Sequence, residues 1–144
     1  MTASDGTRDR LTGAWRLVSA QIRDEDTGEV SDLHGPGPRG FAVFSPEGRV
    51  AVVITASGRK PPTNDAEAAA LHRDMSAYTG RFSLAGDRIV TEVDVAWHPA
   101  WEGSRQLRPC RLDGDRLTLS TEVQGHPAYP GRRLRGTVVW TREG

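Results

Sequence analysis

The segment of residues 11–22, LTGAWRLVSAQI, predicts a β-strand with a large aromatic side chain at its start. Successive strand residues point to opposite faces of a sheet, so alternate positions share one environment. The face that includes the indole consists of Trp15, Leu17, Ser19 and Gln21. We expect this face to point into the core, with Trp15 as a buried aromatic.

Length, net charge and hydropathy limit the classes of protein to which this chain can belong. A length of 144 residues is enough for a sizeable core, and we expect one domain over residues 1–144. Nineteen basic and nineteen acidic residues give a net charge of zero, which argues against a nucleic-acid partner because phosphate binding needs a basic surface. No apolar run approaches the ~18 residues of a membrane span, and the polar N-terminus lacks a signal-peptide core. We therefore expect a cytoplasmic protein with no membrane partner.

Common cofactor and catalytic motifs are missing from the sequence. The single cysteine, Cys110, forms no internal disulfide, and no Cys/His cluster has zinc spacing. We also find no Ser-His-Asp ordering, no phosphate loop and no dinucleotide fingerprint. The sequence therefore predicts neither a metal nor a cofactor.

Short strands separated by turns fill most of the remaining chain, which favours a barrel or a sandwich. Closure into a barrel also removes exposed sheet edges. We expect a short helix over residues 4–11, a second helix over 66–77 whose apolar face covers the barrel, and loops at 31–39 and 124–131. The eight predicted strands are 14–23, 40–45, 49–55, 78–84, 88–96, 103–112, 116–123 and 132–142.

Six segments occur in an order and spacing that resembles the bacterial and fungal lipocalin-like family, a relative of the calycins. They read LTGAWRLVS, GFAVFSPEGRV, AYTGRFSL, HPAWEG, LDGDRLTLS and VVWTR, and together cover most of residues 11–142. The resemblance implies an all-β fold: a closed antiparallel barrel of eight to ten strands around a ligand cavity. A short N-terminal helix would precede the barrel, and one helix would be inserted between strands three and four.

The resemblance also implies a structural role for Arg142. In calycin barrels a late arginine stacks on the indole of the Gly-x-Trp motif, and here Trp15 and Arg142 have the matching positions. The sequence departs from the family at Thr91-Glu92, where relatives commonly carry a histidine. The role of that histidine is therefore not transferred to this chain.

Alternation along the strands predicts which side chains point inward. On the strand of residues 88–96 this rule turns Glu92 and Asp94 outward onto a solvated face, although the opposite facing would make them a carboxylate dyad. The predicted inward residues outside the first strand are Val50, Val52, Ile54, Tyr78, Gly80, Phe82, Leu84, Thr91, Val93, Val95, Gln106, Arg108, Cys110, Leu112, Leu117, Leu119, Thr121, Val123, Leu134, Gly136, Val138, Trp140 and Arg142.

Arg108 is the most informative of these positions. Counting back from Leu112, its guanidinium points into an apolar barrel, which is costly without a partner. One interpretation is an anchor for an anionic or carbonyl group of a ligand. The other is a change of register, because Pro109 removes a ladder donor and favours a bulge.

The segment Trp97-His98-Pro99-Ala100-Trp101 is the second candidate region. Two indoles and a histidine on one connection predict either an aromatic lid with a titratable group or ordinary apolar cover of the barrel end. Tyr78 is a candidate proton donor or a core tyrosine. The candidate catalytic residues are thus Arg108, His98 and Tyr78, and the candidate ligand-binding residues are Trp97, Trp101, Thr91, Ser19, Phe82, Ile54 and Leu119.

Three functions fit this sequence. The first is a cofactor-independent cyclase, isomerase or hydratase of secondary metabolism, acting on a hydrophobic polyketide-like or terpenoid-like molecule in the cavity. The second is a carrier that uses the same cavity without chemistry, and the third is a structural module with a filled barrel. We favour the enzyme by analogy with the family. A homodimer is compatible with the sequence, which does not determine the oligomeric state.

Overall fold

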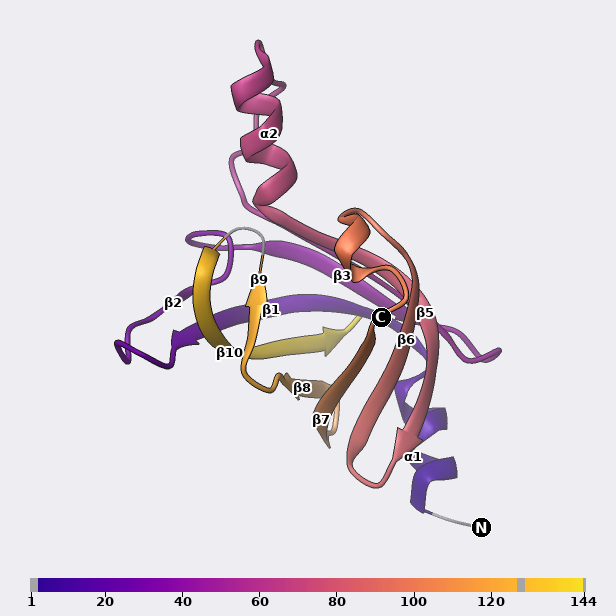
Figure 1. The fold of residues 1–144 in the computed structure, drawn as a ribbon. Helices are drawn as coiled ribbons and strands as arrows, with labels where there is room; N and C mark the ends of the chain where they lie inside the picture. The colour runs from indigo at the N-terminus through magenta and orange to yellow at the C-terminus, as the bar shows by residue number, and fades with distance from the viewer. Residues whose placement is uncertain (1–2, 127–128, 144) are drawn as a thin grey trace.

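The protein is an antiparallel β-barrel, seen in a computed structural model that describes residues 3–126 and 129–143 (Figure 1). Eight strands pair in the order β1-β3-β4-β5-β6-β7-β8-β10, and β10 pairs back onto β1 to close the barrel. The predicted closed eight-stranded barrel is therefore confirmed. The elements are α1 (Ala3–Leu11), β1 (Gly13–Asp24), β2 (Val30–Asp32), β3 (Arg39–Phe44), β4 (Arg49–Thr55), α2 (Asp65–Arg73), β5 (Met75–Ala85), β6 (Arg88–Ala96), the 3₁₀ turn η1 (Pro99–Trp101), β7 (Arg105–Asp113), β8 (Arg116–Ser120), β9 (Gln124–His126) and β10 (Tyr129–Arg142).

Strand β1 closes the barrel, and a bulge in it changes which residues point inward. Its register with β10 shifts between Leu17 and Ser19. A bulge inserts one unpaired residue and so reverses the alternation beyond it. Ala20 and Ile22 are consequently buried, while Gln21 is exposed. The expectation that Ser19 and Gln21 continue the buried face of Trp15 was wrong, because alternation cannot reveal a bulge; Gln21 borders the cavity but is exposed.

A second irregularity in strand pairing, between β5 and β6, changes which residues point inward at the end of β6. Thr79 pairs with Val95 and Gly80 with Val93, so Asp94 is the extra residue. Val95 is consequently 62% exposed, which corrects its predicted inward facing. Asp94 points outward as predicted and accepts hydrogen bonds from Arg49 at 2.5 Å and Thr79 at 2.8 Å. The bond from Arg49, then that from Thr79, lowers the pKa of Asp94 to about 2, so this carboxylate is the acceptor of a surface network.

Helix α2 lies outside the barrel core. It begins after Asn64, whose side chain caps the backbone N–H of Glu67 at 2.8 Å. It ends at Arg73, four residues earlier than expected, because Met75 already pairs with Thr55 in the sheet. None of its residues is buried, and Figure 1 shows it projecting beyond one end of the barrel. The expectation that it covers the barrel was wrong, because its alanine-rich sequence offers too little apolar surface.

Two segments predicted as loops contain short strands. Residues 31–39 and 124–131 overlap β2 and β9, and β10 begins three residues earlier than predicted. Each short strand pairs with one of the two strands that close the barrel: β2 with β1, and β9 with β10. They bring His34 and His126 to the same end of the barrel, where the two rings lie 5.1 Å apart.

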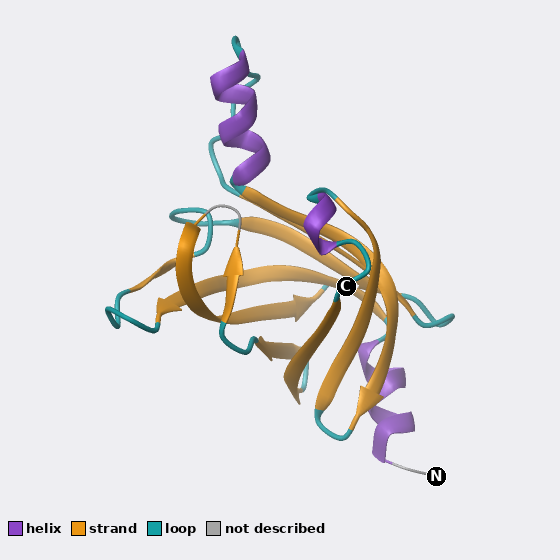
Figure 2. Ribbon diagram, in the orientation of Figure 1, coloured by secondary structure: helices purple, strands orange, loops and turns teal. Residues whose placement is uncertain are grey.

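The opposite end is closed by α1 (Figure 2). Trp15 is fully buried there, and its indole N–H donates to the carbonyl of Leu11 at 2.8 Å. The guanidinium of Arg142 lies 4.3 Å from the centre of the Trp15 ring and donates to the carbonyl of Thr12 at 3.0 Å. Gly13 has a φ of 126°, and a Cβ at this position would lie 3.1 Å from Arg142. Glycine here thus permits both the chain reversal and the stacked arginine.

The helices in the described part of the chain are short and polar. None of them has the length and apolar character that a membrane span requires.

Candidate functional site

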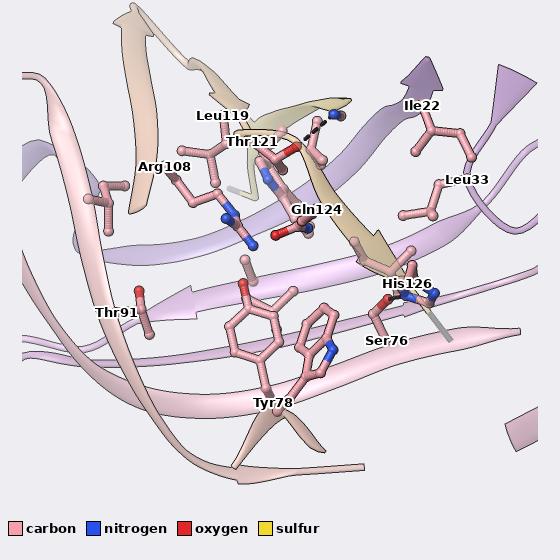
Figure 3. A pocket seen from close by; sticks show the side chains of 18 of the residues that line it. Ile22, Leu33, Ser76, Tyr78, Thr91, Arg108, Leu119, Thr121, Gln124 and His126 are labelled. Carbon is pink, nitrogen blue, oxygen red and sulfur yellow. Dashed lines mark hydrogen bonds between the residues drawn. The ribbon is translucent and has the colours of Figure 1, made fainter. Parts of the chain in front are cut away.

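The barrel encloses a mostly apolar cavity of about 100 Å³ (Figure 3). It extends from Phe44 and Trp140 toward the end that carries α2, which we call the α2 end; the other is the α1 end. The residues that line it are Gln21, Ile22, Leu33, Ala42, Phe44, Val50, Val52, Ile54, Ser76, Tyr78, Ile89, Thr91, Trp101, Arg108, Leu119, Thr121, Gln124, Gly125, His126, Leu134, Gly136, Val138 and Trp140. The barrel is therefore not completely filled by its own side chains.

Arg108 on β7 brings a positive charge into this cavity. Figure 3 shows its guanidinium pointing toward the hydroxyl of Tyr78 and the amide of Gln124. Its side-chain hydrogen bond is a long one, 3.4 Å, to the carbonyl of Leu107. Among the residues that the structure describes, no carboxylate forms an ion pair with Arg108. The cavity thus contains a desolvated cation that none of the described carboxylates pairs with.

The electrostatics of Arg108 and Tyr78 follow from burial. Desolvation lowers the pKa of Arg108, partly offset by Tyr78 and Glu122, and a guanidinium remains charged in proteins. Desolvation also raises the pKa of Tyr78, partly offset by the charge of Arg108. At neutral pH, Tyr78 is therefore a neutral phenol that can donate a hydrogen bond beside a fixed positive charge.

One further donor in the cavity wall lacks an acceptor. The indole nitrogen of Trp140 is buried and makes no hydrogen bond within the described part of the chain. Buried donors of this kind are rare in folded proteins and usually have a functional or solvent partner. Arg108 and Trp140 each bring a hydrogen-bond donor to the residues that line the cavity.

The predicted site residues separate into two groups. Six of them line the cavity: Ile54, Tyr78, Thr91, Trp101, Arg108 and Leu119. Phe82 is buried against Phe44, with ring centroids 5.1 Å apart, and does not line it. Ser19 lies outside the lining, because of the bulge in β1.

Trp97 and His98 form part of an aromatic cluster beside the cavity at the α2 end. Trp97 contacts Trp101 edge-to-face at 4.8 Å and stacks on His126 at 5.8 Å. Its indole N–H donates to the carbonyl of His72 at 2.8 Å. His98 caps η1 by accepting from the backbone N–H of Ala100 at 3.1 Å. The structure thus gives His98 a local structural contact and places Trp101 at the cavity.

A cluster of polar residues that the sequence did not suggest lies at the same end. His34 Nδ1 is 3.1 Å from Asp74 Oδ1, and His34 Nε2 is 3.1 Å from Ser76 Oγ. Ser76 Oγ is also 2.9 Å from His126 Nε2. His34 and Ser76 are buried, whereas the side chain of Asp74 is 47% exposed. The sequence has no Ser-His-Asp ordering that would point to this cluster, and the side chains meet because the loop after β2 brings His34 across to the start of β5.

Burial also controls the charge of the two histidines in this cluster. Desolvation lowers the pKa of His34, although Asp74 opposes the shift. Desolvation, followed by repulsion from His34 and His98, lowers the pKa of His126 to about 4. Both rings are therefore neutral at pH 7.

The described residues of this region do not form a metal site. Among residues 3–126 and 129–143, no group of three or more His, Cys, Asp or Glu side chains has an arrangement that could hold a metal ion.

Comparison with known proteins identifies the family. The model of the lipocalin-like domain matches residues 12–143, which includes every strand of the barrel. No curated protein matches the sequence. A lipocalin-like barrel with an internal apolar cavity is a small-molecule-binding domain. The fold, the cavity and the match to the family model are consistent with one another. The chain belongs to the lipocalin-like domain family.

Proposed function

We propose that this protein is a cofactor-independent enzyme that transfers protons on a hydrophobic substrate, as a cyclase, an isomerase or a hydratase does. The observation that carries the proposal is the guanidinium of Arg108 inside an apolar cavity, where it forms no ion pair with any carboxylate that the structure describes. A buried charge without a partner costs free energy. That cost is offset when a ligand supplies an anionic oxygen or a polarised carbonyl.

Arg108 and Tyr78 have complementary roles in this proposal. The guanidinium stabilises negative charge that develops on an enolate or carbonyl oxygen in the transition state. The neutral phenol of Tyr78 donates a hydrogen bond or a proton to the same oxygen. Trp101, Leu119 and Ile54 contact the apolar body of the substrate and exclude water from it.

The size of the cavity limits the substrate. Its volume of about 100 Å³ is below the ~300–1,000 Å³ of typical ligand sites and near the ~150 Å³ that holds one benzene ring. We therefore expect one ring or a short branched chain to enter the barrel, with the remainder of a polyketide-like or terpenoid-like molecule lying against the aromatic cluster at the α2 end.

The test begins with the small molecules that co-purify with the protein from native cells, identified by mass spectrometry. The purified protein is then incubated with each compound in D₂O, without added cofactor, and conversion and deuterium uptake are followed. Arg108→Leu should fold normally and lower turnover or affinity by ~2–4 kcal/mol, the scale of one lost charge-stabilising donor. Arg111→Leu, on the exposed face of the same strand, is the matched control.

A carrier function is the alternative outcome of this experiment. Tight binding of a co-purified compound, with neither conversion nor deuterium uptake, would establish a carrier and exclude the enzyme. Normal binding and turnover by Arg108→Leu would remove Arg108 from the site.

A further inference from the structure

Asp74, His34, Ser76 and His126 form a hydrogen-bonded chain whose direction is set by their chemistry. A carboxylate only accepts, so Nδ1 of His34 donates to Asp74 and its Nε2 carries a lone pair. That lone pair accepts the hydroxyl proton of Ser76. Ser76 Oγ then accepts from the Nε2–H of His126. The serine is therefore bonded to a base that a carboxylate orients.

We propose that Ser76, His34 and Asp74 act as a nucleophile, base and orienting acid that transfer the acyl group of short, apolar esters or thioesters. This constellation is recognised by geometry and by the role of each group rather than by sequence position. Both hydrogen bonds of 3.1 Å fall within the range that such pairs show without substrate.

The protonation states support this assignment. His34 is neutral at pH 7 because burial lowers its pKa, so its Nε2 is free to accept a proton. Asp74 then stabilises the imidazolium that forms. His126 is also neutral, with a pKa of about 4, and its Nε2–H lies next to the position at which an oxyanion would develop.

The cavity provides a site for the acyl chain. Ser76 lines the cavity at the α2 end, and Figure 3 shows it beside His126 and apart from Arg108. Leu33 and Ile54, which also line it, are buried and apolar. A volume of about 100 Å³ favours short acyl chains over long ones.

The reaction has two balanced steps. Ser76 Oγ attacks the acyl carbonyl carbon while its proton passes to His34 Nε2, and the carbonyl electrons move to the oxygen. Collapse of this intermediate expels the alcohol or thiol, which takes the proton from His34. Water then attacks the acyl-serine ester, His34 accepts the proton of this water and returns it to Ser76, and a carboxylic acid leaves.

This activity goes beyond the proton transfer proposed for Arg108 and Tyr78. It requires a covalent acyl-enzyme at a different end of the cavity. Modification of Ser76 is measured without knowledge of the natural substrate, so failure of one proposal leaves the other standing.

The experiment uses diisopropyl fluorophosphate and a series of p-nitrophenyl esters. The intact wild-type protein should gain one phosphoryl group, and peptide mapping should place it on Ser76. p-Nitrophenyl acetate and butyrate should be hydrolysed with an initial burst, and the dodecanoate more slowly. This part of the test needs no variant to fold.

Single-residue variants then test the role proposed for each side chain. Ser76→Ala should abolish labelling and the burst, while Ser83→Ala, exposed on the outward face of the same strand, should behave as wild type. His34→Asn suits the positive φ of 62° at this position and should slow acylation by ~10²- to 10⁴-fold. Asp74→Asn should slow it at least tenfold, and Asp113→Asn, at the exposed end of β7, should not.

Two results would overturn the proposal. One is the absence of both phosphorylation and ester turnover in the wild-type protein, or a label on another residue. The other is labelling of Asp74→Asn and His34→Asn at the wild-type rate. In either case the four side chains only hold the loop of His34 against β5.

Discussion

The two ends of the barrel are built on opposite principles. At the α1 end, Trp15 is fully buried, its indole N–H is satisfied and its face is covered by Arg142. The α2 end instead gathers all four histidines of the sequence, in contact with one another or with Trp97. We expect the α1 end to contribute more to stability, because its two stacked side chains close the barrel around a fully buried indole. The histidines are gathered at the end where Ser76, Trp101 and His126 line the cavity.

The largest effect that we predict tests the stabilising role of the α1 end. Trp15→Ala should lower the free energy of unfolding by ~3–5 kcal/mol, because it removes a large buried aromatic and leaves a cavity. Chemical denaturation measures this loss. Trp97→Ala, at the α2 end, should cost less because its indole is only partly buried. A loss below 1 kcal/mol for Trp15→Ala would contradict the contrast between the two ends.

The second prediction concerns the histidines of the α2 end. The pKa of His126 is about 4 in the folded protein, against its ordinary value of 6.5, so the unfolded chain binds a proton that the folded chain does not. Stability is therefore fully present above pH 6.5 and is lost as the pH falls toward 4, by up to about 3 kcal/mol. His34 contributes in the same direction, because its pKa is also lowered.

Thermal melting between pH 7 and pH 4 measures this loss. His126→Gln should flatten the pH dependence of the melting temperature, while His72→Gln, on the exposed face of α2, should not. Identical pH profiles for wild type and His126→Gln would show that His126 remains accessible to protons.

The third prediction separates stacking from simple charge at the α1 end. Arg142→Lys should cost ~1–2 kcal/mol, because lysine cannot combine the stacked contact on Trp15 with the hydrogen bond to Thr12. Arg133→Lys is the matched control on the same strand, where an exposed pair with Asp26 should contribute less than about 1 kcal/mol. Equal costs for the two variants, from urea denaturation, would remove the special role of Arg142.

The smallest predicted effect is spectroscopic. Binding of 1-anilinonaphthalene-8-sulfonate, an apolar anion, should quench tryptophan fluorescence through Trp97 and Trp101 at the α2 end. The double variant Trp97→Phe/Trp101→Phe should lose this response. A response that persists in the variant would assign it to Trp15 or Trp140 instead.

Much of the fold could be predicted because strand alternation and turn chemistry are local. The strand of residues 49–55 has its three buried residues, Val50, Val52 and Ile54, where alternation places them. Bulges in β1 and β6 could not be predicted, because an extra residue is stabilised by the partner strand and not by its own sequence. The predicted inward orientation of Ser19 and Val95 was wrong for this reason.

The candidate site was only partly predictable. The inward position of Arg108 could be predicted because alternation along one strand, counted back from Leu112, fixes which way its side chain points. The sequence predicts one helix over residues 66–77, and this prediction conceals that Ser76 shares the inward face of Tyr78 on β5. His34 could not be found at all, since its loop meets Asp74 only after β2 pairs with β1.

The pairing of β1 with β10 has a consequence for how fast the protein folds. Arg135 on β10 and Glu25, the residue after β1, form an ion pair although they are 110 positions apart. Bringing such distant segments together lowers the entropy of the chain before the contacts between them form and stabilise it. Folds dominated by distant contacts therefore take milliseconds to seconds to form. During synthesis, β1 remains without its closing partner until residue 142 has left the ribosome. Until then its apolar face is available to chaperones or to other chains.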